Sequence, residues 1–91
     1  MNAKQIAKEI YAELALLDNE AVTSIARLIS AHYGEEFCDN LSQSTLFDIT
    51  NAFYEIADAD KNILIDNSEN EGKTVGLPYN VTFVVRKNKA N

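Results

Sequence analysis

The stretch that decides the fold is residues 44–65, STLFDITNAFYEIADADKNILI, because its apolar pattern changes period partway along. The first part has apolar residues at steps of three and four, which is typical of the buried face of an α-helix: Leu46, Ile49, Phe53 and Ile56. The run Ile-Leu-Ile at 63–65 favours a strand instead. We therefore predict a helix over about 44–57, with Ser44 as its N-cap, and then a strand over about 62–66.

Two more amphipathic helices are predicted upstream. Residues 2–17 have apolar residues at alternating steps of four and three, forming one stripe: Ala3, Ala7, Ile10, Leu14 and Leu17. The segment 20–33 repeats this pattern, with an apolar face of Val22, Ile25 and Ile29. The polar triplet 18–20 ends the first helix and caps the second, and Gly34 suits the end of the second because glycine tolerates positive φ. The short connection favours an antiparallel helical hairpin.

The C-terminal segment completes an α+β fold class. Apolar and other residues alternate over 81–87, which predicts a second strand. A polar segment at 67–76 separates the two strands, and Pro78 excludes a helix there. We predict three amphipathic helices followed by a C-terminal antiparallel β-hairpin. A chain of 91 residues is long enough for one core, so the prediction is a single small domain over 1–91.

The composition is that of a folded globular chain, 46% hydrophobic and 24% charged. No apolar run approaches the roughly 20 residues that span a bilayer. The N-terminal residues mix charged and apolar side chains, unlike a secretory signal. The single Cys38 cannot form an internal disulfide, which is typical of a reducing compartment. We therefore expect a cytoplasmic protein without membrane association.

Acidic residues are concentrated in the middle of the chain. The formal net charge is −6, and residues 35–71 hold ten acids against one base, whereas 72–91 hold four bases and no acid. Such a region attracts basic surfaces and repels phosphate backbones, although surface acids also serve solubility alone. We predict that the region provides an interaction face that includes Glu35, Glu36, Asp48, Glu55, Asp58 and Asp60.

In size and charge the chain resembles small acidic cytoplasmic proteins that inhibit restriction or CRISPR nucleases. In that class carboxylates take the positions of nucleic-acid phosphates. No motif carries the resemblance, which implies a non-enzymatic protein that presents an acidic, nucleic-acid-like face to a basic protein partner. The apolar stripe of 2–17, together with exposed strand edges, also leaves room for a homodimer.

The segment 58-DADKNILIDNSE-69 resembles a calcium-binding EF-hand loop. Side-chain oxygens stand at the spacing of the ligands in such a loop: Asp58, Asp60, Asn62, Asp66 and Glu69. The sixth position holds Ile63 where the loop needs a glycine with positive φ, and no exit helix is predicted. A calcium-binding module is therefore the second hypothesis, and a helix end followed by a strand is the structural alternative.

A winged-helix nucleic-acid binder is the third hypothesis, since three predicted helices precede a predicted hairpin. The exposed face of the third predicted helix carries acids and no Lys or Arg, which disfavours phosphate contact: Gln43, Thr45, Asp48, Asn51, Glu55 and Asp58. Arg86, Lys87 and Lys89 are the one basic cluster. Nucleic-acid binding is therefore disfavoured.

Catalysis and cofactor binding have no recognisable motif in the sequence. His32 and Cys38 are the single imidazole and thiol, and no pattern positions them as base and nucleophile. We expect His32 to be a partly buried helix residue and Cys38 a small apolar contact. One histidine and one cysteine are too few for a structural zinc site. We predict a non-enzymatic protein without a cofactor.

Overall fold

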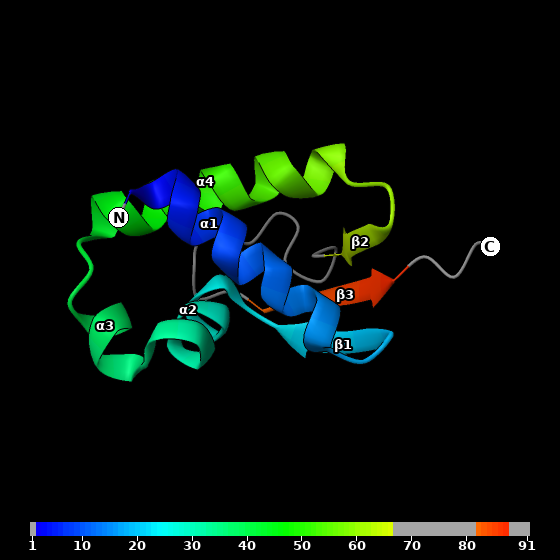
Figure 1. The fold of residues 1–91 in the computed structure, drawn as a ribbon, viewed down its shortest axis with the longest axis horizontal. Helices are drawn as coiled ribbons and strands as arrows, with labels where there is room; N and C mark the ends of the chain where they lie inside the picture. The colour runs from blue at the N-terminus through cyan, green and yellow to red at the C-terminus, as the bar shows by residue number, and fades with distance from the viewer. Residues whose placement is uncertain (1, 67–81, 88–91) are drawn as a thin grey trace.

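A computed structural model of the chain describes residues 2–66 and 82–87 (Figure 1). The described elements are, in chain order, α1 Ala3–Ala12, a 3₁₀ turn Glu13–Leu16, β1 Glu20–Thr23, α2 Ile25–Tyr33, α3 Glu35–Asp39, α4 Gln43–Ala59, β2 Ile63–Asp66 and β3 Phe83–Lys87. These segments form four α-helices and one three-stranded antiparallel sheet in a small domain. The α+β class is confirmed, and the predicted two-stranded hairpin is part of a larger sheet.

The predicted helix over 20–33 is wrong for its first five residues. Glu20–Thr23 form β1, which pairs antiparallel with β3 in the register Ala21↔Val85. Ser24, rather than the triplet 18–20, caps α2, because its Oγ accepts the backbone N–H of Arg27 at 3.1 Å. A strand therefore lies between α1 and α2, so the two helices do not form the predicted simple hairpin.

Three further boundaries differ from the prediction. The α-helical part of the first helix ends at Ala12, and a 3₁₀ turn continues it to Leu16. The predicted linker 35–42 contains the short helix α3. The N-cap of α4 is Ser42 instead of Ser44, because Ser42 Oγ accepts the backbone N–H of Thr45 at 3.2 Å. Gly34 does end α2, at a φ of 101°, as the sequence predicts.

The sheet has the order β1-β3-β2, so the strand from the C-terminal end lies in the middle. The predicted pairing of β2 with β3 is confirmed, with Ile65 opposite Val85. Phe83 and Val85 are buried on the face of β3 that faces the helices, as their alternation predicts. On the other face Arg86 reaches both edge strands, bonding Glu20 and Asp66 at 2.8 Å each. The central strand is therefore tied to the core on one face and to both neighbours on the other.

The core lies between α1, α2, α4 and the inner face of the sheet. Buried residues of α1 and α4 make up most of it, and the two helices lie side by side and run in the same direction (Figure 1). Phe53 is fully buried. The centroid of its ring lies 5.3 Å from the ring centroid of Tyr11 and 5.9 Å from that of Phe83. Within residues 2–66 and 82–87, no helix combines the length and apolar character needed to cross a membrane.

Candidate functional site

Three of the predicted interaction residues form a row on the exposed face of α4. Asp48, Glu55 and Asp58 follow one another at steps of seven and three residues, which keeps them on one side of a helix. All three are exposed, whereas Ile49 and Phe53 on the opposite side are fully buried. None of the three forms an ion pair with another described residue. The α4 acid row, as we call these three residues, is thus held by a rigid, well-packed helix.

Asp60, the fourth predicted residue on this segment, has a structural role. It is the C-cap of α4, and its Oδ1 accepts the backbone N–H of Asn62 at 2.8 Å. Its Oδ2 accepts the hydroxyl of Tyr11 at 2.8 Å, which ties α4 to α1. Burial of Tyr11, followed by this hydrogen bond, raises the pKa of the phenol well above its usual value. Asp60 is therefore partly shielded and already bonded, unlike Asp58 two residues before it.

Glu35 and Glu36 lie apart from the α4 acid row. Both are exposed in the first turn of α3, where the helix dipole stabilises negatively charged side chains. α3 packs against α2, as Figure 1 shows, rather than along α4. The six predicted interaction residues are thus divided among a row on α4, a cap at its end and a pair on α3.

A groove runs beside the α4 acid row, between α4 and α1. One part of it has a volume of about 420 Å³ and is lined by Lys4, Lys8, Ala52, Glu55, Ile56 and Ala59. Toward the start of both helices it continues into a second hollow, which shares Lys4, Ala52 and Glu55 and adds Asp48. This α1–α4 groove has a basic wall on α1 and an acidic wall on α4. The spacing of Lys4 and Lys8, one turn apart, is the sequence signal for the basic wall.

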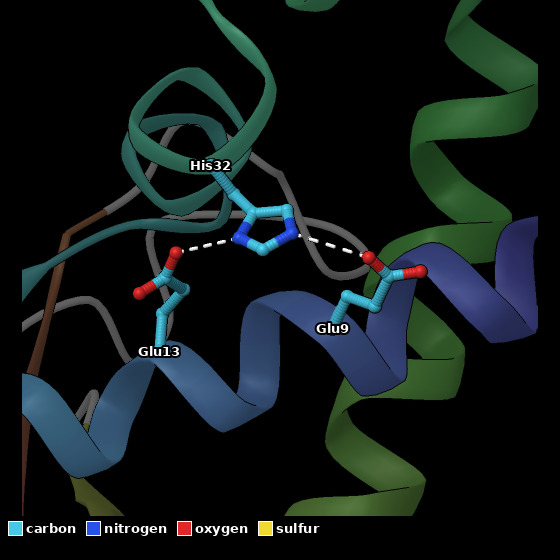
Figure 2. Close-up of polar contacts among 3 residues, drawn as sticks. All are labelled: Glu9, Glu13 and His32. Atoms are coloured by element: carbon cyan, nitrogen blue, oxygen red, sulfur yellow. Dashed lines mark hydrogen bonds and ion pairs between the residues drawn. The ribbon is translucent and has the colours of Figure 1, made fainter.

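The histidine bridges two carboxylates, Glu9 of α1 and Glu13 at the start of the 3₁₀ turn (Figure 2). His32 Nδ1 lies 2.6 Å from Glu13 Oε1, and Nε2 lies 3.1 Å from Glu9 Oε1. Both bonds require an N–H on each ring nitrogen, so the arrangement suits the charged imidazolium. The hydrogen bond to Glu13, and then that to Glu9, holds the pKa of His32 above its usual value.

This arrangement joins α1 to α2 and leaves no ring nitrogen of His32 with a free lone pair. A general base needs such a lone pair, so His32 is a bridging residue here. His32 lies in α2 and its side chain is 32% exposed, which agrees with the predicted partly buried helix residue. Glu9 and Glu13 likewise face α2 rather than bulk solvent. The residue spacing of α1 and α2 alone could not reveal this contact, since it depends on how the helices cross.

The described part of the EF-hand-like segment consists of a helix end and a strand. Asp58 belongs to the last turn of α4, and Ile63 lies in β2 instead of in a sharp turn. Asp60 accepts two hydrogen bonds, and Asp66 is bonded to Arg86. Within residues 2–66 and 82–87, no three His, Cys, Asp or Glu side chains are grouped to hold a metal ion. Glu69, the last predicted ligand, lies outside the described residues.

Two residues of the basic cluster are used within the fold. Arg86 bonds Glu20 and Asp66, and those bonds raise the pKa of its guanidinium. Lys87 Nζ donates to the carbonyl oxygens of Ala15 and Leu17 at the end of the 3₁₀ turn. These contacts occupy the cations on which the nucleic-acid hypothesis depends. Lys89 lies outside the described residues.

Cys38 packs against the core beside Phe37, as predicted. Its Sγ lies 3.9 Å from the carbonyl oxygen of Ala26 in α2, so α3 is attached to α2 through a small, half-buried side chain.

Comparison with known proteins found no match for this chain among protein-family models, curated proteins or solved structures. Functional arguments therefore rest on the geometry of its own residues.

Proposed function

We propose that this protein is non-enzymatic and acts in the cytoplasm by binding a protein with a basic surface. The α4 acid row is the interface. The observation that carries the proposal is the row itself: three exposed carboxylates on one face of a packed helix, without ion pairs to other described residues. By contrast, Glu9, Glu13, Glu20, Asp60 and Asp66 are all bonded within the fold.

The row resembles a line of phosphates in charge and in rigidity. A helix rises about 1.5 Å per residue, so Asp48 and Glu55 are separated by about 10 Å along α4 and Asp58 by about 5 Å more. Fixed charges at such spacings steer a basic partner into place and set the register of the complex. A partner whose groove normally binds nucleic acid fits this charge pattern, which makes inhibition of such a partner the specific form of the proposal.

The test is capture of the partner by wild-type protein and by a charge-reversed α4 variant, Asp48→Lys with Glu55→Lys and Asp58→Lys. Immobilised wild-type protein is exposed to lysate of the source cells, and retained proteins are quantified by mass spectrometry. We expect the variant to retain its main partner at least about tenfold less, because charge complementarity sets both encounter and register. Added duplex DNA should displace the partner from the wild-type protein.

A matched variant reverses three acids on α3, Glu35→Lys with Glu36→Lys and Asp39→Lys. Its net charge equals that of the α4 variant, but α3 lies beside α2 rather than along the row. We expect it to retain the partner. Equal loss in both correctly folded variants, or no partner at all for the wild-type protein, would contradict the proposal.

A further inference from the structure

We propose that the α1–α4 groove binds a second copy of this chain, forming a dimer with its two-fold axis along the groove. The inference does not rest on the proposed function, because the partner is the chain itself, but both interfaces use Asp48 and Glu55, so the dimer and the complex with a basic partner exclude each other. It starts from the two walls. Lys4 and Lys8 stand on α1, and Asp48 and Glu55 on α4.

All four wall residues are exposed, and none forms an ion pair with another residue in the described part of the chain. A two-fold interface brings the same patch of both copies together, so the patch must be complementary to itself. A groove with one basic and one acidic wall meets this condition, whereas a surface of one charge repels its own copy.

The direction of the helices decides which axis is favourable. α1 and α4 run the same way, since Lys4 lines the groove with Asp48, Lys8 lines it with Ala59, and Tyr11 bonds Asp60 (Figure 1). A two-fold rotation about an axis along the groove places the basic wall of one copy opposite the acidic wall of the other. Lys4 of each copy then lies opposite Asp48 and Glu55 of the other. An axis across the groove would instead place lysines opposite lysines, so charge selects the first arrangement.

The floor of the groove allows close approach. Ala52, Ile56 and Ala59 form it, and two of these are alanines, which keep the surface flat enough for helices to pack across it. α4 is about 25 Å long and two adjacent helices are about 20 Å wide, so each copy would bury about 500 Å². The total is near the lower limit of about 1,000 Å² for specific interfaces. We therefore expect a weak dimer that depends on concentration and salt.

The first test is sedimentation equilibrium of the full chain from about 10 µM to about 1 mM protein. It compares about 0.01 M salt with about 1 M, between which the Debye length falls from about 30 Å to about 3 Å. We expect the mass at low salt to rise from 10.1 kDa toward twice that value, and to rise less at high salt. A protein that stays monomeric at low salt throughout this range would overturn the proposal.

Charge reversal then identifies the walls. The variants Lys4→Glu with Lys8→Glu, and Asp48→Lys with Glu55→Lys, should each be monomeric, because every wall then has one sign. Mixed in equal amounts they should associate, since one variant presents acidic walls and the other basic walls. The matched control replaces the second variant by Glu35→Lys with Glu36→Lys, which has the same net charge but keeps the basic wall and the acidic wall of the wild-type groove. It should associate with itself rather than with the first variant, whose two walls are both acidic. Association that all variants retain would overturn the proposal.

Cross-linking tests the axis. Ala59 is exposed on the floor of the groove, and it would lie near Ala59 of the other copy if the two-fold axis follows the groove. Ala59→Cys, in a Cys38→Ser background, should therefore form a covalent dimer with a short bis-maleimide. Ala31→Cys on the exposed side of α2 should not. A dimer without the Ala59→Cys cross-link would contradict the proposed axis. Circular dichroism of every variant verifies that its helices are intact.

Discussion

The carboxylates of α1 and of the 3₁₀ turn that continues it lie beside those of α4, yet the two sets are used in opposite ways. Glu9 of α1 and Glu13 of the 3₁₀ turn both bond one imidazole of α2. Asp48 and Glu55 of α4 face solvent without an ion pair to any residue in the described segments. The difference shows that the number of acids along a segment does not locate an interaction face. What matters is which acids the fold has already bonded.

The position of each helix explains the contrast. α1 lies between α4 and α2, so one of its sides borders the groove, one faces the core and one meets His32. α4 packs against α1 and the sheet through a single side, leaving its acid row outward. The carboxylates on the α1 side that meets α2 are therefore bonded, whereas those on the outward side of α4 are not.

The largest effect is expected at the residue that supports both regions. Phe53 of α4 is fully buried and its ring contacts the rings of Tyr11 in α1 and Phe83 in β3. Phe53→Ala should lower the free energy of unfolding by about 3–5 kcal/mol, because it removes buried apolar surface and leaves a cavity. Urea unfolding followed by circular dichroism measures this loss. A change below about 1 kcal/mol would mean that α1 and α4 do not depend on this contact.

A smaller effect should distinguish two carboxylates that lie two residues apart. Tyr11→Phe removes the hydrogen bond to Asp60 and should lower the free energy of unfolding by about 1 kcal/mol. Asp58→Asn, in the exposed α4 acid row, should change it by less than about 0.5 kcal/mol. Urea unfolding at neutral pH measures both variants. Equal effects would remove the distinction between a bonded and a free carboxylate at this end of α4.

The carboxylates of α1 should make stability depend on pH. Hydrogen bonds from Glu13 and Glu9 raise the pKa of His32 in the folded state above the unfolded value of about 6.5. The contribution of the bridge is therefore fully present below about pH 6.5 and is lost as the pH rises through the folded pKa. Urea midpoints between about pH 5 and 9 should show this decline.

His32 is the one histidine of the chain, so its ring proton can be followed by NMR without ambiguity. Its pKa should lie above that of a free histidine, and Glu13→Gln should lower it more than Glu9→Gln, since the Glu13 bond is shorter. The control Glu55→Gln, on α4, should leave the pKa unchanged. A wild-type pKa at or below about 6.5 would contradict the bridge.

The smallest effect is expected from calcium. Asp60 and Asp66 are bonded to Tyr11 and Arg86, and Ile63 is part of a paired strand, so binding calcium would require these contacts to break. We expect thermal unfolding in millimolar calcium to match that in equimolar magnesium. A calcium-specific rise of several degrees, abolished by Asp58→Ala with Asp60→Ala, would instead establish a metal site.

Local patterns predicted the elements whose partners are close in sequence or whose apolar pattern extends over many residues. The stripe of α1, the buried face of α4 and the pairing of β2 with β3 all follow from residue spacing. β1 was missed because it has four residues and its partner β3 lies about sixty residues later in the chain. Val22 also fits a helical period, so spacing alone could not distinguish the two.

For the candidate site, spacing predicts only which acids share one face of a helix. The spacing of Asp48, Glu55 and Asp58 on one helix predicts a row, and α4 holds them as a row. The sequence offers no measure of which acids are bonded, so Asp60 and the α3 pair were grouped with that row. The bonds of Asp60 to Tyr11, and of Arg86 to both edge strands, join residues 49, 66 and 20 positions apart.

By itself, the sequence determined the α+β class, the faces of α1 and α4, and the concentration of acids between residues 35 and 71. These properties depend on residue types and on distances of a few residues, which helix and strand periods relate directly to faces. The tertiary structure alone decided the central place of β3, the bridge at His32 and the pairing of a basic with an acidic wall along one groove. Each of these depends on how elements cross in space, and a local period contains no information about that crossing.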